Sequence, residues 1–208
     1  AVQAGVTIEK IFALESYRDQ LSAFPQIVWV SEEILRDLAD TQTPQGIVAV
    51  IQKEEVGPPD FSQGKFLFLE DVQDPGNVGT MIRTADAAGF TGVIVSDKSA
   101  DIYSLKTLRS MQGSHFHLPI YRMPVATFIE EAKKSNLPIL ATTLSRDSKD
   151  YRELSPLENF ALVMGNEGQG ISSIMAESAD QLVHIGMKGR AESLNVAVAA
   201  GILMFYFS

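Results

Sequence analysis

The sequence predicts an α/β fold, a mostly parallel sheet with helices on both faces, preceded by a small α/β domain. From Lys65 onward, short continuous apolar runs alternate with helical segments, which is typical of a parallel sheet covered on both faces. Residues 53–64 are polar and rich in Pro and Gly, which indicates a linker. We therefore expect a small domain over residues 1–52, a linker over 53–64 and a large domain over 65–208.

The first domain is predicted from short strand and helix signals. Ser31 offers an N-cap, and Glu32 and Glu33 follow it in the first helical turn. A unit of this size is too small to be an enzyme by itself, so a binding or docking role fits it better. Because the chain begins with Ala rather than Met, we expect this domain to be incomplete at its N-terminus. The predicted elements are strands at 8–14, 27–30 and 46–51, and a helix after Ser31 with an apolar face of Ile34, Leu35 and Leu38.

The second domain is predicted from the alternation itself. Each apolar run has the length of a buried strand, and the segments between the runs have helical spacing or a capping residue. Ligands of such sheets bind beyond the carboxyl ends of the strands, so the turns after these runs are candidate sites. Predicted strands cover 66–69, 93–95, 118–121, 139–143, 160–164 and 182–185, and predicted helices cover 78–88, 105–111, 125–135, 171–177 and 194–207.

Composition excludes several classes of protein. The 208 residues include no Cys, which excludes disulfides, thiolate zinc sites and cysteine nucleophiles and suits a reducing cytoplasm. The longest apolar run, residues 196–207, is shorter than the roughly 20 residues that span a bilayer, so no membrane partner is expected. The net charge of −9 argues against non-specific binding of nucleic acid, although Lys and Arg of the second domain could form a local basic patch.

A metal site is not expected. His115 and His117 flank Phe116 and, as i and i+2 neighbours on an extended segment, could point to one side. No third ligand can be named beside them, because the sequence has no Cys and no suitable acidic cluster.

The first polar turn, residues 70–77, follows a predicted strand and opens a helix. Its Asp-Pro-Gly-Asn sequence has turn chemistry, and Asn77 at its end is the predicted N-cap. Arg83 lies almost two helical turns further on. An Arg in this place can simply solvate a helix face. The functional alternative is a guanidinium fixed for a phosphate or a ribose oxygen.

Two further polar turns follow later strands. Gly165–Gly170 carries three glycines, which allow a ligand to approach the backbone closely. This turn lacks the Lys-Ser/Thr of a phosphate loop, and its Glu167 disfavours a bound polyphosphate. In the third turn, Ser193 and Asn195 are candidate caps at the mouth of the last helix. Together the turns predict an adenosine-type pocket built from backbone groups, with apolar walls at Ile185, Met187 and Leu194.

In this order, the three turns resemble the motifs of the SpoU (TrmH-like) RNA ribose 2′-O-methyltransferases of the SPOUT superfamily. The likeness covers the whole domain from about Lys65. One departure is Gly186, which stands where this family commonly has Pro and which loosens the segment. The matching residues are Asn77-x-Gly79-x-x-x-Arg83-Thr84-Ala85, then Leu162-Val163-Met164-Gly165-Asn166-Glu167-x-x-Gly170, then Ile185-x-Met187-x-Gly189-x-x-Glu192-Ser193-Leu194-Asn195-Val196.

The resemblance implies a deep C-terminal trefoil knot, a homodimer and S-adenosyl-L-methionine (AdoMet) as cofactor, with no metal required. It also implies that residues 1–52 are most of a substrate-binding domain of the ribosomal-protein-like type. It places Asn77, Arg83, Glu167, Ser193 and Asn195 on the catalytic surface. It assigns the cofactor contacts to Thr143, Leu144, Gly165, Ile185, Met187 and Leu194.

The implied reaction is methyl transfer from AdoMet to a ribose 2′-hydroxyl of structured RNA. In this family the Arg of the first motif has been assigned as the base, but a guanidinium with a pKa above about 12 resists that role. Our hypothesis is that Arg83 grips a substrate phosphate and stabilises developing alkoxide charge. The proton would then leave to phosphate or water. Ser193 and Asn195 would orient the ribose, and Glu167 would hold Asn or Arg partners.

The RNA is expected to be ribosomal RNA, because residues 1–52 resemble a substrate-reading domain, with transfer RNA as the alternative. Two other classes of function stay open. One is a non-catalytic RNA-binding module of the same fold, and the other is a nucleotide-binding enzyme that uses the glycine-rich turn. A comparison of AdoMet binding with ATP binding distinguishes the methyltransferase from the nucleotide-binding enzyme.

Overall fold

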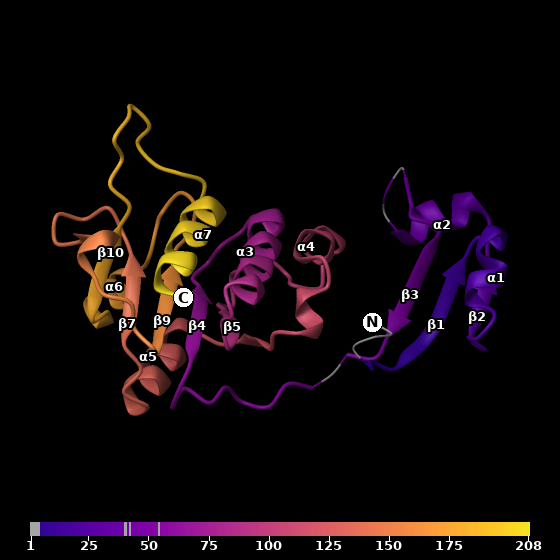
Figure 1. The fold of residues 1–208 in the computed structure, drawn as a ribbon, viewed down its shortest axis with the longest axis horizontal. Helices are drawn as coiled ribbons and strands as arrows, with labels where there is room; N and C mark the ends of the chain where they lie inside the picture. The colour runs from indigo at the N-terminus through magenta and orange to yellow at the C-terminus, as the bar shows by residue number, and fades with distance from the viewer. Residues whose placement is uncertain (1–4, 40, 42, 54) are drawn as a thin grey trace. The chain divides into compact units, whose positions relative to one another are not determined.

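The chain forms two compact units, Ala1–Glu55 and Val56–Ser208. The computed structural model describes residues 5–39, 41, 43–53 and 55–208 (Figure 1). The boundary between the units lies inside the Pro- and Gly-rich stretch of residues 53–64. Each unit has its own hydrophobic core.

The first unit is built on a small mixed sheet in the order β2-β1-β3. Strand β1 pairs with β2 in parallel and with β3 antiparallel. The three predicted strands and the helix after Ser31 are all present, and Ser31 Oγ accepts the Ile34 N–H at 3.4 Å. The unpredicted α1 is a single turn that buries only Leu21. The elements are β1 (Ile8–Ala13), η1 (Glu15–Tyr17), α1 (Arg18–Leu21), β2 (Ile27–Trp29), α2 (Glu32–Ala39) and β3 (Ile47–Ile51).

The described residues of the second unit form a seven-stranded sheet in the order β6-β5-β4-β9-β7-β10-β8. Every pairing within this sheet is parallel. Its central strands are continuous apolar runs because both of their faces are buried. The strands are β4 (Lys65–Leu69), β5 (Gly92–Val95), β6 (Ile120–Arg122), β7 (Ile139–Thr142), β8 (Lys149–Asp150), β9 (Phe160–Met164) and β10 (Gln181–His184).

Helices cover both faces of this sheet, so the predicted fold class is confirmed. Alternation along β4 directs Leu67 and Leu69 to a core shared with α3, α4 and α7, and Phe66 and Phe68 to a core shared with α5 and α6. On the second face Phe68 stacks on Phe128 of α5, with ring centroids 4.1 Å apart. The helices and turns are α3 (Pro75–Ala87), α4 (Leu105–Met111), η2 (Ser114–Phe116), α5 (Val125–Lys134), η3 (Tyr151–Glu153), α6 (Ser173–Ser178) and α7 (Val196–Phe207).

Two predicted helix caps need correction. Asn77 is not the N-cap of α3: the helix begins at Pro75, and Asp74 Oδ1 accepts the Asn77 N–H at 2.9 Å. An Asp before a Pro is a strong start signal, because Pro suits the first helical position. Helix α7 begins at Val196 with Asn195 as its cap, so Ser193 is not a cap. As a result, the Asn77 side chain is available for bonds outside the helix.

The histidine pair was also wrongly predicted. His115 and His117 do not lie on an extended segment, because residues 114–116 form the 3₁₀ turn η2 and the strand starts only at Ile120. The i and i+2 side chains of such a turn do not share one side.

Helix α7 is apolar along its whole length and packs on α3 beside β9 (Figure 1). Of the helices that the structure describes, none combines the length and apolar character needed to cross a bilayer.

Candidate active site

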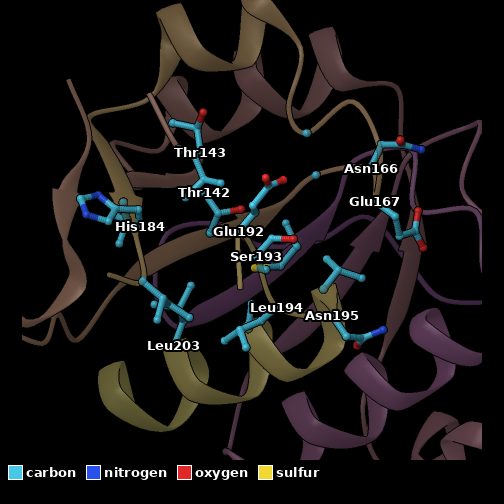
Figure 2. Close-up of a pocket in the computed structure, with 18 of the residues that line it drawn as sticks. Thr142, Thr143, Asn166, Glu167, His184, Glu192, Ser193, Leu194, Asn195 and Leu203 are labelled. Carbon is cyan, nitrogen blue, oxygen red and sulfur yellow. The ribbon is translucent and has the colours of Figure 1, made fainter. Parts of the chain in front are cut away.

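Four loops meet where the neighbouring strands β4, β9, β7 and β10 end. Three of them, with the start of α7, enclose a cavity of about 870 Å³. Figure 2 shows Glu167 and Asn195 on one side of this cavity, His184 on the opposite side and Glu192 between them. The lining residues are Thr142, Thr143, Leu144, Ser145, Met164, Gly165, Asn166, Glu167, Gly168, Gln169, Gly170, Val183, His184, Ile185, Met187, Glu192, Ser193, Leu194, Asn195, Val196, Ala199 and Leu203.

The structure brings most of the predicted site residues together. The predicted catalytic residues Glu167, Ser193 and Asn195 line the cavity, whereas Asn77 reaches it through hydrogen bonds. Arg83 does not line it. All six residues predicted to contact the cofactor line the cavity, namely Thr143, Leu144, Gly165, Ile185, Met187 and Leu194.

Asn195 joins the third motif to the first. Its Oδ1 accepts the backbone N–H groups of Ala197 at 2.9 Å and Val198 at 3.3 Å, which caps α7. Its Nδ2 therefore faces the other way and donates to Asn77 Oδ1 at 3.1 Å. One amide thus begins a helix and holds a side chain of another helix.

Asn77 passes this connection to the second motif. Its Nδ2 donates to Glu167 Oε1 at 3.1 Å. An ionised carboxylate can only accept, so Asn77 must present its nitrogen to Glu167 and its oxygen to Asn195. The three hydrogen-bonded side chains form what we call the amide chain Glu167–Asn77–Asn195. Donation runs in one direction along it, from Asn195 to Asn77 and from Asn77 to Glu167.

Glu167 also holds the loop that precedes α3. Its carboxylate accepts the backbone N–H groups of Gln73 at 3.3 Å and Asp74 at 3.2 Å. Partial burial raises the pKa of Glu167, but the bonds from Asn77, Asp74 and Gln73 outweigh that effect and the pKa lies below its ordinary value. The carboxylate is therefore charged at neutral pH and stabilises both loops.

The glycine-rich turn is held by its own backbone. Asn166 and Gly170 exchange two backbone hydrogen bonds, of 2.9 and 3.0 Å. A Cβ on the buried Gly165 would come within 2.6 Å of the Gly170 oxygen and 2.5 Å of the Ile171 nitrogen. Gly165 is thus required by the returning chain. Gly165, Gly168 and Gly170 also line the cavity, and the close approach of a ligand to their backbone stays a prediction.

Asn166 is a residue of the second motif to which the sequence assigned no role. Its Oδ1 accepts the N–H groups of Gly168 and Gln169, at 2.9 and 3.0 Å. Its Nδ2 donates to the Asp71 carbonyl at 2.8 Å. The side chain therefore shapes the turn and ties it to the end of β4.

Glu70 is a buried acid beneath the same turn. Its side chain is 2% exposed, and among the described residues its Oε2 has no hydrogen-bond partner. Burial raises the pKa of Glu70, and hydrogen bonds from Ser172 oppose that rise. Ser172 follows the glycine-rich turn and caps α6, so Glu70 anchors the far end of the turn. The signal in the sequence that could have identified Glu70 is an acidic residue directly after an apolar strand.

The cavity is acidic. Glu167 and Glu192 contribute carboxylates, and no Lys or Arg is found among its lining residues in the described part of the chain. His184 also lines the cavity, and its Nδ1 lies 2.9 Å from Ser148 Oγ. Such a lining favours a cationic or neutral ligand over a polyphosphate. No role was predicted for Glu192 or His184 from the sequence.

Arg83 lies apart from this network. It is exposed on α3, about 9 Å further along the helix axis than Asn77. Among the described residues it has no hydrogen-bond or ion-pair partner, so its guanidinium is available to a ligand outside the cavity.

Within residues 5–39, 41, 43–53 and 55–208, no three His, Asp or Glu side chains form a group that could hold a metal ion. The expectation that no metal takes part stays a prediction.

Known proteins share this architecture. A sequence model described as the SpoU rRNA Methylase family matches residues 64–205. RlmP of Bacillus subtilis (strain 168), a 23S rRNA (guanosine(2553)-2′-O)-methyltransferase, is 42% identical over 181 residues, which cover 87% of this chain and 72% of the relative. An AdoMet-bound rRNA methyltransferase from Sinorhizobium meliloti superposes with a TM-score of 0.87 at 32% identity, covering 99% of this chain and 81% of that chain. The SpoU methyltransferase AviRb from Streptomyces viridochromogenes, in complex with AdoMet, gives a TM-score of 0.83 at 29% identity, covering 99% and 83%.

Proposed function

This chain belongs to the SpoU rRNA methylase family, and on that premise we propose that the cavity beside α7 is where it methylates a ribose 2′-hydroxyl of ribosomal RNA with AdoMet as cofactor. The family predicted from the three motifs is thereby confirmed. The observation that carries the assignment of the site is the amide chain Glu167–Asn77–Asn195, because it joins one residue from each motif at the cavity.

The cavity residues fit AdoMet in size and charge. About 870 Å³ lies in the range of sites for ligands of this kind. Bound AdoMet supplies an activated methyl group on a positively charged sulfur. Ile185, Met187 and Leu194 provide apolar walls for the adenosine part, while the carboxylates of Glu167 and Glu192 provide the negative charge that suits a cation.

The amide chain prepares the ribose side of the site. Asn195 and Ser193 are proposed to orient the ribose, and Glu167 keeps Asn77 and the first turn in place. Holding the reacting groups in line is a major source of rate in such a transfer, worth roughly 7–11 kcal/mol in well-oriented intramolecular reactions.

Arg83 is proposed to act on the RNA rather than on the cofactor. Its guanidinium has no partner among the described residues and does not line the cavity. An unpaired guanidinium binds phosphate well, and it stabilises negative charge that develops on the ribose oxygen. We propose that the 2′-hydroxyl proton leaves to phosphate or water.

Ribosomal RNA is the proposed substrate because the RlmP relative is named for a 2′-O-methylation of 23S rRNA. The enzyme is accordingly proposed to act in the cytoplasm. The first unit, Ala1–Glu55, is proposed to read the RNA, because the binding role expected for it complements a catalytic second unit. Transfer RNA is the alternative substrate.

A homodimer is proposed from the outer face of α7. Val198, Ile202 and Phe205 lie at i, i+4 and i+7 and are 53%, 36% and 58% exposed. A helix that is apolar on all sides is typical of a buried element, and a second copy of this chain would bury the exposed stripe. We also propose the trefoil knot of the SPOUT fold around the segment between β10 and α7. Light scattering would test the dimer against the 22.7 kDa of one chain.

Calorimetry with AdoMet and with ATP tests the proposed cofactor. We expect the protein to bind AdoMet and not ATP, because the described lining carries two carboxylates and no Lys or Arg. ATP binding without AdoMet binding would overturn the proposal in favour of a nucleotide-binding enzyme.

A further inference from the structure

Asp150 and Arg152 form a carboxylate–guanidinium pair beside the segment that follows β10 and lines the cavity. Arg152 Nε donates to Asp150 Oδ1 and Arg152 Nη2 donates to Asp150 Oδ2, each at 2.7 Å. The Arg152 backbone N–H adds a third bond to Oδ1 at 3.1 Å. A forked pair of this kind fixes both side chains in one geometry. The Asp150 side chain is only 14% exposed, so water screens it little.

The pair stands against the backbone of Gly186. Strand β8 runs parallel to β10 with Asp150 opposite His184, and Gly186 follows two residues later. A Cβ built on Gly186 would come within 2.7 Å of Asp150 Oδ2. The Arg152 guanidinium, and to a smaller extent the Gly186 amide, hold the pKa of the Asp150 carboxyl well below its usual range. The carboxylate thus faces this backbone and attracts its amide.

Backbone conformation does not explain why position 186 is a glycine. Gly186 is not among the glycines with a positive φ, so an L-residue could adopt its conformation. The obstacle to a side chain is the Asp150 carboxylate. Residue 186 and residue 150 are therefore matched to one another.

Gly186 separates two walls of the cavity, Ile185 and Met187. Displacing its backbone would move both walls together. The pair that faces it is itself anchored, because Tyr206 Oη of α7 donates to the carbonyl of Leu154 at 3.2 Å and to that of Arg152 at 3.4 Å. The Tyr151 and Tyr206 rings also meet edge to face at 4.8 Å. The segment 150–154 therefore connects the Gly186 backbone to helix α7.

We propose that Asp150 is a positioning residue for the cofactor site: held by Arg152, its carboxylate clamps the backbone of Gly186 and sets the spacing between Ile185 and Met187. This inference rests on the proposed function. A glycine leaves the backbone at position 186 less rigid than another residue would, and the clamp restrains that backbone through a side-chain contact. The ion pair itself contributes little stability, because Arg152 is half-exposed. What sets this pair apart is that its carboxylate faces the Gly186 backbone.

The test is a double-mutant cycle read out as AdoMet affinity. Gly186→Ala inserts a methyl group against the carboxylate, and Asp150→Ala removes the carboxylate. We expect each single variant to weaken AdoMet binding by about tenfold or more, and the double variant to bind no more weakly than Asp150→Ala alone, because contacting residues do not act additively. Asp150→Asn keeps the size of the side chain but has one acceptor oxygen, so it cannot accept from both the Arg152 fork and the Gly186 amide and should also weaken binding, by about threefold or more.

Two further measurements separate positioning from a merely structural role. At saturating AdoMet, kcat should stay within about twofold of wild type while KM for AdoMet rises, because only ground-state binding is lost. The Tm without cofactor should change no more than in Glu130→Ala, which breaks an ion pair on α5. Single-variant affinities equal to wild type, additive losses, or a parallel fall of kcat and Tm would each overturn the clamp. A wild-type protein that fails to bind AdoMet would instead overturn the proposed function.

Discussion

The Nδ2 group of Asn195 donates a hydrogen bond to the Oδ1 atom of Asn77 at 3.1 Å, although 118 residues separate the two. The same Asn195 side chain caps α7 through its oxygen, so the helix start and the site are held by one amide. Positioning of the ribose should therefore depend on Asn195 in a way that can be separated from the stability of α7.

The Asn195→Asp variant makes this separation. A carboxylate at 195 still accepts the N–H groups of Ala197 and Val198, but it has no hydrogen to donate to Asn77. We expect methyl transfer to fall by about 10- to 100-fold with an almost unchanged Tm, because small misplacements at a reacting centre cost rates of this size.

Asn195→Ala is the control, because it removes both the cap and the bond to Asn77. A lost N-cap costs about 1 kcal/mol, so its Tm should fall by about 2–4 °C. Wild-type turnover in Asn195→Asp would show that the bond to Asn77 has no part in catalysis.

The stability that Glu167 provides should depend on pH. Its pKa in the folded protein lies below the ordinary value of about 4.3. The stabilisation is therefore fully present above the ordinary pKa and is lost as the pH falls through the lower folded value. Because the carboxylate is partly exposed, the effect should be about 1 kcal/mol or less.

Melting curves of wild type and Glu167→Gln between pH 3 and pH 7 check this prediction. The difference in Tm should be largest near pH 7 and should shrink towards pH 3, as Glu167 becomes protonated. A difference that stays constant over the whole range would mean that the charge of Glu167 does not stabilise the two loops.

Glu192 should distinguish the cationic cofactor from its neutral product. Its carboxylate lines a cavity with no Lys or Arg among the described lining residues. For Glu192→Gln we expect AdoMet affinity to fall by about fivefold, a loss of about 1 kcal/mol, and the affinity for S-adenosyl-homocysteine to stay the same. Titration calorimetry with both ligands measures the ratio.

Glu158→Gln is the matched control for Glu192, because Glu158 is an exposed carboxylate that does not line the cavity. It should leave both affinities unchanged. Equal losses for the two ligands in Glu192→Gln would assign Glu192 to packing or hydrogen bonding rather than to charge.

Arg83 should act on transfer but not on cofactor binding, because it lies outside the cavity. Arg83→Gln keeps hydrogen-bond donors and removes the charge. We expect turnover at saturating AdoMet to fall by about 100-fold or more, which is typical of a lost charge stabiliser, with an unchanged Kd for AdoMet. Arg83→Lys should recover part of the loss. Near-normal turnover in Arg83→Gln would exclude charge stabilisation by this residue.

Elements with strong local signals were predicted well from the sequence. The bounds of β9 (Phe160–Met164) and α4 (Leu105–Met111) match the prediction because a continuous apolar run and a clear cap define them. Strand β8 was missed because its two residues have no pattern of their own and pair only after β10 is in place. The N-cap of α3 was assigned to Asn77 because the stronger Asp74-Pro75 signal was read only as a turn.

The site was predictable in its members but not in its contacts. The resemblance named the residues, and its six cofactor candidates, four from the motifs together with Thr143 and Leu144, all line the cavity. Which amide atom of Asn77 faces Glu167 depends on loops almost a hundred residues apart, and no local pattern encodes that. The clamp between Asp150 and Gly186 was equally hidden, because a glycine without a positive φ gives no sign in the sequence of the side chain that it accommodates.

Mapping of ribose 2′-O-methyl groups in total RNA, with and without this protein, tests the central claim most directly. We predict that a methyl group at a defined position of ribosomal RNA is present with the wild-type protein, is lost without it, and is largely absent with Asn195→Asp. An unchanged methylation pattern of ribosomal RNA in all three samples would contradict the claim, and a change confined to transfer RNA would replace the substrate.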